Sequence, residues 1–90
     1  MPQLNFTPAL KRFFPDLKSD HFEGNTIQEV LDNIEAQYPT IKDYLIDEEG
    51  KLRKHINIFV GEQMIADRIQ LSDEVSDQDE VLIFQALSGG

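Results

Sequence analysis

Few residues of this chain could carry out covalent chemistry by themselves. Its ninety residues include no cysteine and two histidines, His21 and His55. Neither histidine stands beside a serine and an acid in an arrangement typical of nucleophilic catalysis. The lack of cysteine excludes disulfides, thiolate zinc sites, iron–sulfur clusters and thiol nucleophiles. We therefore do not expect an enzyme with its own catalytic machinery.

A run of acids is the second candidate for chemistry. Five carboxylates fall between residues 73 and 80, namely Asp73, Glu74, Asp77, Asp79 and Glu80. The ligand spacing and central glycine of a calcium loop are absent, as are the glycine-rich phosphate loops. We expect a solvated loop, or a surface for a basic partner, with no bound metal or cofactor.

The last two residues of the sequence, Gly89 and Gly90, are the third candidate. A glycine pair at a given place occurs in about 0.5% of chains when each position is glycine about 7% of the time. A frayed end would explain it, but the pair follows an apolar strand and a short linker, so the last four residues could extend about 14 Å. Glycine lacks Cβ and can enter a narrow channel. We expect the terminal carboxylate to be held on an extended tail that can enter the active site of another enzyme.

Two patterns in the sequence predict the elements that carry this tail, and the first pattern predicts a helix. Thr26 and Glu29 form a capping box, and apolar residues recur with helical spacing at Ile27, Val30, Leu31, Ile34 and Tyr38. Pro39 ends the helix. A second apolar cluster, residues 41–46, predicts one or two further helical turns.

The second pattern is a set of strands. Alternation predicts strands around Leu4 and Phe6, near Asp20–Glu23, over residues 55–60 and 81–84, and a short one over 63–66. The phenylalanines of the first hairpin (Phe13, Phe14 and Phe22) are expected to pack on the core, as are Ile69, Leu71 and Val75 in the irregular connection 67–80. One helix on a mixed sheet of four to five strands is an α+β, β-grasp (ubiquitin-like) architecture. We expect a single domain over residues 1–90, with a flexible tail over 85–90.

Strand alternation also predicts a surface for partners. If Ile56, Ile58 and Val60 face the helix, then Phe59 points outward. In the last strand Leu82 and Phe84 then join Phe59 in an exposed apolar patch near the tail, which is typical of an interface. Burial of both faces by a loop is the alternative.

Composition limits the partners. Acidic residues number 17 against 8 basic ones, which gives a formal charge of −9. This charge argues against nucleic acid and anionic membranes and favours a basic partner surface. Lys51, Arg53 and Lys54 form a small basic cluster that we assign to a solvated loop. No apolar run approaches the ~20 residues of a membrane span, and no signal peptide is apparent, so we expect a soluble cytoplasmic protein.

Several of these features together resemble a known family. Thr26, the helix through Tyr38-Pro39, the strand Ile56–Val60 and the ending VLIFQALSGG resemble the MoaD/ThiS sulfur carriers, and the stretch IEAQYPTIKDYLIDEEGKLRKHINIFVGEQ is most similar to their CysO-like branch. The resemblance covers residues 25–90 well and the first hairpin loosely. Only the two terminal glycines are specific, since fold likeness alone does not establish function.

The resemblance implies a cycle in which all catalytic groups belong to partners. An E1-like adenylyltransferase, using Mg-ATP, would adenylate the Gly90 carboxylate, and a sulfurtransferase or other sulfur donor would convert it to a thiocarboxylate. A sulfur-accepting synthase would then use that sulfur for molybdopterin, thiamine or cysteine. Gly90 is the reacting residue, Gly89 and Ser88 give access, and the partner-binding residues are Phe59, Leu82, Phe84, Ala86 and Leu87.

Two alternatives remain open at this point. The chain could be a ubiquitin-like modifier that Gly90 joins to lysines of target proteins, or a binding module with an inert tail. Gene neighbours and intact mass would distinguish these possibilities.

Overall fold

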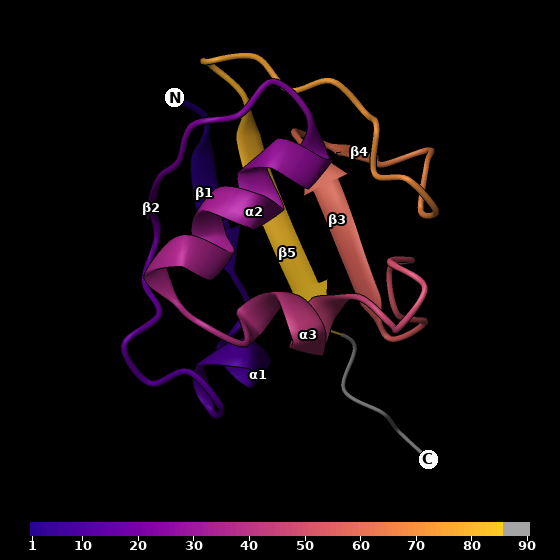
Figure 1. Ribbon diagram of the computed structural model, residues 1–90. Coiled ribbons are helices and arrows are strands. Elements are labelled where there is room, and N and C mark those ends of the chain that lie inside the picture. The colour runs from indigo at the N-terminus through magenta and orange to yellow at the C-terminus, as the bar shows by residue number, and fades with distance from the viewer. Residues whose placement is uncertain (86–90) are drawn as a thin grey trace.

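A five-stranded mixed sheet forms the framework of the computed structural model, which describes residues 1–85 (Figure 1). The strand order is β2-β1-β5-β3-β4, and the central pair β1 and β5 is parallel while the other pairs are antiparallel. The α+β, β-grasp prediction is confirmed. The strands are β1 (Gln3–Phe6), β2 (Asp20–His21), β3 (Ile56–Val60), β4 (Gln63–Met64) and β5 (Glu80–Gln85).

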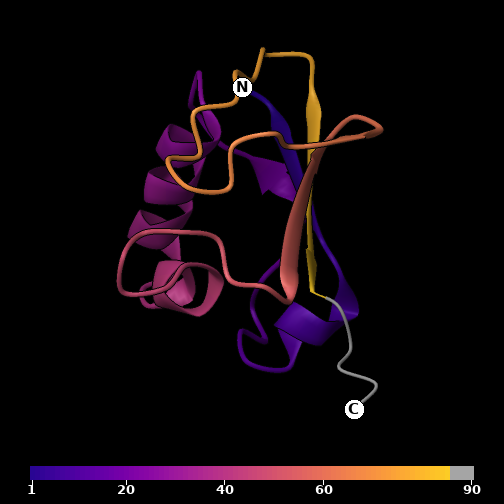
Figure 2. The ribbon, with the colours of Figure 1, turned by 90° about the vertical axis from the view of Figure 1, so that its right-hand side faces the viewer.

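Within residues 1–85, three helices accompany the sheet: α1 (Pro8–Lys11), α2 (Ile27–Gln37) and α3 (Ile41–Leu45). Figure 2, which views the sheet on edge, shows α2 and α3 on the same side. The outer face of the sheet is the face turned away from α2. Within residues 1–85 no helix is long and apolar enough to cross a membrane.

The predicted ends of α2 are confirmed by its hydrogen bonds. The Glu29 backbone N–H donates to Thr26 Oγ1 at 3.2 Å. In return Glu29 Oε1 accepts from the Asn25 backbone N–H, one residue before the cap. The Tyr38 N–H donates to the Ile34 carbonyl at 2.8 Å, and Pro39 follows, so the helix cannot continue.

The core lies between α2 and the inner face of the sheet. Four residues of the predicted helical stripe are buried completely or nearly so, Ile27, Val30, Leu31 and Ile34, whereas Tyr38 is only partly buried. The inward residues of β3 and β5 are buried as well, namely Ile56, Ile58, Val81 and Ile83. Apolar burial of this kind is the main favourable term in folding. It fixes which face of each strand points outward, because side chains alternate along a strand.

Two predicted core residues are exposed instead, so those predictions are wrong. Phe13 is 59% exposed because the chain after β1 forms α1, whose buried residue is Leu10. Ile69 is 61% exposed because its turn directs Leu71 toward the core. In addition, β5 includes Gln85, which the sequence assigned to the tail.

Candidate functional site

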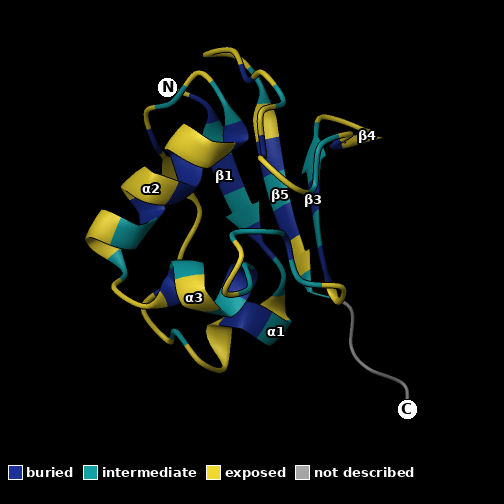
Figure 3. Cartoon of the chain, turned by 45° about the vertical axis from the view of Figure 1, so that its right-hand side comes forward, coloured by how far each residue is buried: buried dark blue, intermediate teal, exposed yellow. Residues whose placement is uncertain are grey.

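The outer faces of β3 and β5 carry an apolar surface. Phe59 pairs with Leu82 and Asn57 pairs with Phe84, while Ile58 and Ile83 between them are buried. Figure 3 shows the alternating bands of burial along β5. We define the outer-face patch as Phe59, Leu82 and Phe84; with Asn57 and Gly61 these residues line a shallow depression of about 310 Å³. The predicted outward orientation is confirmed, and partner binding stays a prediction.

Met64 extends this patch, and the sequence reasoning missed it. Met64 pairs with Phe59 across the β3–β4 hairpin, so both side chains lie on the same face. Its exposed fraction is 52%. The signal was available, because a two-residue turn at Gly61 and Glu62 places position 64 opposite position 59.

Arg68 places a positive charge at the edge of the outer-face patch. Its Nη1 donates to Asn57 Oδ1 at 2.8 Å, and its Nη2 donates to the carbonyls of Arg53 and Ile56 at 2.7 and 2.8 Å. The guanidinium therefore holds the side chain of Asn57 and satisfies carbonyl groups at the start of β3. Such cover protects an exposed strand edge from wrong pairing.

Gln85, the last described residue, is held from two sides. The Tyr44 hydroxyl donates to Gln85 Oε1 at 3.0 Å, and the Gln85 backbone N–H donates to Thr7 Oγ1 at 3.2 Å. The β5 strand therefore ends at a defined point beside α3 and the start of α1 (Figure 1). The remaining predicted site residues lie outside the described part of the chain: Ala86, Leu87, Ser88, Gly89 and Gly90.

The acidic run does not assemble into a metal site. Asp73 accepts backbone N–H groups of Ala66 and Asp67 at 2.9 and 2.7 Å, and Asp79 accepts the N–H of Ser76. Within residues 1–85 no three His, Asp or Glu side chains are grouped to hold a metal ion. The run ends at Glu80, the first residue of β5, so it lies at the end of the sheet opposite Gln85, about 17 Å away along the strand.

Asp67 is a structural acid in the neighbouring loop. The N–H of Gln70 and the hydroxyl of Ser72, followed by the N–H groups of Ile69 and Ser72, lower the pKa of Asp67 to about 2. The carboxylate thus organises the turn that orients Leu71. These hydrogen bonds stabilise the ionised form of Asp67, so its lowered pKa needs no catalytic explanation.

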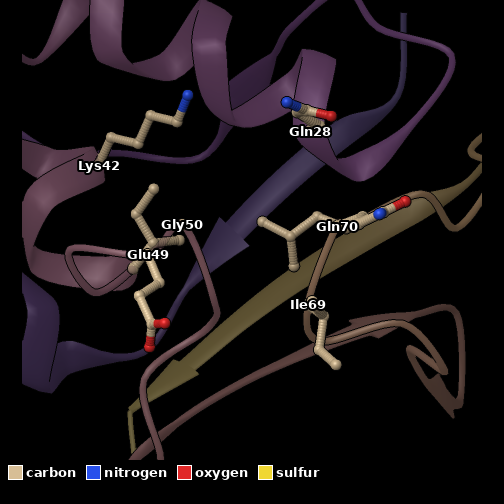
Figure 4. Close-up of a pocket in the computed structure, with 8 residues that line it drawn as sticks. Gln28, Lys42, Glu49, Gly50, Ile69 and Gln70 are labelled. Carbon is tan, nitrogen blue, oxygen red and sulfur yellow. The ribbon is translucent and has the colours of Figure 1, made fainter.

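A cleft of about 370 Å³ opens between α3, the start of α2 and two loops (Figure 4). Lys42, at its edge, forms an ion pair with Asp32, and Glu49 lies 3.7 Å from the Lys51 amine. Figure 4 shows the Lys42 amine and the Glu49 carboxylate pointing in opposite directions. The cleft therefore does not bring two reactive groups together. Its lining is Gln28, Lys42, Ile46, Glu49, Gly50, Ile69, Gln70 and Leu71.

The two histidines lie apart and exposed. His21 is on β2, and His55 precedes β3, with its ring edge-to-face against Tyr44 at a centroid distance of 6.2 Å. Among the hydrogen bonds of residues 1–85, none joins either imidazole to a serine or a carboxylate. The arrangement offers no nucleophile and base pair in this part of the chain.

Comparison with known proteins identifies similar chains. The model of the ThiS family matches residues 7–90. The sulfur carrier protein CysO of Mycobacterium tuberculosis (strain H37Rv) is 33% identical over 75 residues, which are 81% of each chain. CysO of Mycobacterium bovis is identical to the same extent over the same share of each chain.

Solved structures of similar proteins have the same fold as this chain. A chain from the Amycolatopsis orientalis BexX/CysO complex superimposes with a TM-score of 0.85 and 29% identity over 100% of both chains. M. tuberculosis CysO has a TM-score of 0.83 and 27% identity, over 97% of this chain and 100% of the other. SAMP1 from Haloferax volcanii, at 21% identity, a TM-score of 0.76 and coverage of 98% and 97%, shares the fold.

Proposed function

Because this chain belongs to the ThiS family, we propose that it is a sulfur carrier protein that holds sulfur on the carboxylate of Gly90. The observation that carries the proposal is a family match that runs through Gly89 to Gly90. The 33% identity to CysO supports the same role. The chain is then a co-substrate on which partner enzymes act, in the cytoplasm.

The proposed chemistry has two steps. The Gly90 carboxylate attacks the α-phosphate of Mg-ATP, which forms an acyl-adenylate and releases pyrophosphate. Sulfide then adds to the acyl carbon and expels AMP, which leaves a thiocarboxylate; a persulfide donor serves equally if a second thiol cleaves the resulting disulfide. A carboxylate is a poor electrophile, and the adenylate provides the leaving group it lacks.

Partners supply the catalytic groups in this scheme. An E1-like adenylyltransferase binds Mg-ATP, a sulfurtransferase or another donor provides sulfur, and a synthase accepts it. The chain has no cysteine with which to hold sulfur as a persulfide of its own. The main-chain carboxylate is a sulfur-binding group that needs no thiol. Among molybdopterin, thiamine and cysteine as products, the similarity to CysO favours cysteine.

The outer-face patch is the proposed docking surface for the adenylyltransferase. Phe84 lies one residue before Gln85, so an enzyme seated on the patch stands next to the base of the tail. Exposed apolar side chains in one cluster are typical of interfaces, and phenylalanine is enriched at their centres. Ala86 and Leu87 extend this proposed contact along the tail.

Intact-mass spectrometry tests the proposal. The full chain is incubated with the adenylyltransferase of its source organism, Mg-ATP and sulfide. We expect the mass increase of one oxygen replaced by sulfur, located at Gly90, and no increase for a variant that lacks Gly90. An unchanged mass for the full chain, or equal conversion of the shortened variant, would refute the assignment.

The same experiment separates the protein-modifier alternative. The small archaeal modifier protein SAMP1 has the same fold, but the 21% identity carries no more than the fold. Addition of cell lysate with ATP would join a modifier to lysines of other proteins, and the adducts would contain a Gly90 isopeptide. Adducts without a thiocarboxylate would favour the modifier, and neither product would indicate a binding module with an inert tail.

A further inference from the structure

Three rings from separate parts of the chain meet beside the end of β5. We define the aromatic platform as Phe13, which follows α1, Tyr44 of α3 and His55, which precedes β3. The Phe13 and Tyr44 ring centroids are 5.0 Å apart with an interplanar angle of 37°, and His55 stands edge-to-face to Tyr44. Phe14 supports Tyr44 from another side at 6.0 Å.

Two of the three rings of the platform are exposed. Phe13 is 59% exposed and His55 is also exposed, while Tyr44 is partly buried. Phe13 contributes little to the core, yet its ring lies against Tyr44 in a tilted arrangement. An ordered aromatic surface of this kind resembles the anchors of protein interfaces more than a solvated loop.

We propose that the aromatic platform is a second docking surface for the enzyme that adenylates Gly90, distinct from the outer-face patch. The inference rests on the proposed function. It starts from the hydrogen bond between Tyr44 and Gln85, which places the platform at the base of the tail. Gln85 faces the α3 side through this bond, whereas Phe84 faces the outer side.

The length of the tail brings the enzyme close to both surfaces. Residues 86–90 extend at most about 17 Å. An active site that receives Gly90 therefore lies within that distance of Gln85, and the walls of its entrance cover the side chains around Gln85. One wall meets Phe84 and the outer-face patch, and the opposite wall meets Tyr44 and the platform.

The charges near the platform indicate which side chains the enzyme would need on the wall that meets it. Lys11 and Arg12 precede Phe13, Lys54 precedes His55, and all three are exposed. Asp43 is the acidic neighbour of Tyr44. Three exposed cations are therefore sequence neighbours of platform residues, against one acid, although the chain carries −9 overall. The enzyme is expected to offer an apolar side chain flanked by carboxylates, the opposite of what net charge suggests.

Steady-state kinetics of pyrophosphate release with the full-length carrier test this inference. We expect Phe13→Ala to raise the KM for the carrier about tenfold with kcat unchanged, as for loss of one anchor residue.

The double variant Arg12→Glu, Lys54→Glu should also raise KM, and the effect should shrink at high salt. The matched control, Glu74→Lys with Asp77→Lys at the opposite end of the sheet, should leave KM within about twofold. Thermal melts confirm that each variant is folded.

The outcomes separate the two proposals. A wild-type chain that is not adenylated overturns the proposed function and this inference with it. A wild-type chain that is adenylated while Phe13→Ala retains its KM overturns the inference alone. A lower KM for the Arg12, Lys54 variant would show that the enzyme surface is basic, and concentration-dependent dimers abolished by Phe13→Ala would assign the platform to a second copy. Either result contradicts the proposal.

Discussion

Phe84 lies in an apolar stretch of sequence that is typical of a buried strand, yet its side chain is on the surface. It ends an apolar run of four residues, yet it is 37% exposed while Ile83 beside it is completely buried. The pairing of Phe84 with Asn57 puts both on the outer face. Because successive side chains of a strand point to opposite faces, the burial of Ile83 leaves Phe84 on the surface.

At the residue scale we predict that Phe84→Asp weakens binding of the adenylyltransferase at least about tenfold. The charge would be placed in an apolar contact, where burial without a partner is costly. The loss of β-propensity costs about 1 kcal/mol, which a domain with about 5–15 kcal/mol of stability tolerates. Calorimetric titration measures the affinity, and circular dichroism checks the fold.

Ile69→Asp is the matched control for this prediction. Ile69 is 61% exposed and lines the cleft beside α2 and α3 rather than the outer-face depression, so the same change there should leave the affinity unaltered. Equal affinities for wild type and Phe84→Asp would remove the outer-face patch from the interface, as would an equal loss in both variants.

At the element scale, the loop between β4 and β5 is organised by two acids as well as by its buried apolar residues. Asp67 accepts N–H groups from Ile69, Gln70 and Ser72, and Asp73 accepts those of Ala66 and Asp67. These bonds hold Leu71 in a left-handed conformation, with φ of 56°, so that its side chain enters the core. The loop is irregular in secondary structure and still specific in geometry.

We predict that Asp67→Asn lowers the melting temperature at pH 6 and that the difference narrows on acidification. The folded-state pKa is lowered from 3.8 to about 2, so the folded state favours the ionised carboxylate. This contribution to stability is complete above about pH 3.8 and is lost as the pH falls through about 2. Thermal melts of both proteins between pH 2 and pH 7 measure the difference.

Glu62→Gln, an exposed carboxylate in the β3–β4 turn, controls for the removal of one negative charge. If the Asp67→Asn difference were constant with pH, or grew as the pH fell, the hydrogen bonds to the ionised carboxylate would not be its cause.

At the scale of the whole molecule, the two ends of the sheet differ in character. The acidic run lies where β5 begins, and the aromatic platform lies where β5 ends, beside α1 and α3 (Figure 1). The net charge of the chain is therefore a poor guide to the kind of partner surface that each end binds. An approaching enzyme experiences the local charge within about 10 Å at 0.1 M salt, since more distant charges are screened.

We predict that removal of residues 86–90 separates folding from function. The buried apolar residues of the described chain run from Leu4 to Ile83, and the Ile56–Gln85 pair is retained. The melting temperature should change by no more than about 2 °C, whereas adenylation should be abolished. Calorimetry and the pyrophosphate assay measure the two effects.

A longer truncation, which removes residues 84–90, is the control. It also deletes the Asn57–Phe84 and Ile56–Gln85 pairs and the hydrogen bond to Tyr44, so the melting temperature should fall by several degrees. A domain that unfolds after the shorter deletion, or is still adenylated, would contradict the prediction.

Much of this architecture follows from local patterns in the sequence. The capping residues Thr26 and Glu29, the helical stripe and Pro39 determine where α2 begins and ends. Period-two alternation determines that Phe59 and Ile58 face opposite sides. The ending around Gly90 supports the family, although its structure lies outside the described residues. These features depend on backbone hydrogen bonds and side-chain spacing within a few residues, which the sequence displays directly.

The tertiary structure alone decided which distant residues meet. Phe13 was expected in the core, but the short helix α1 leaves it exposed against Tyr44, whose hydroxyl donates a hydrogen bond to Gln85. Arg68 reaches Asn57 and the start of β3, and nothing in the local pattern indicates that contact. Such contacts depend on strand order, on the parallel pairing of β1 with β5 and on how the core closes. Each is a global result of burying apolar surface, because no segment can satisfy that requirement by itself.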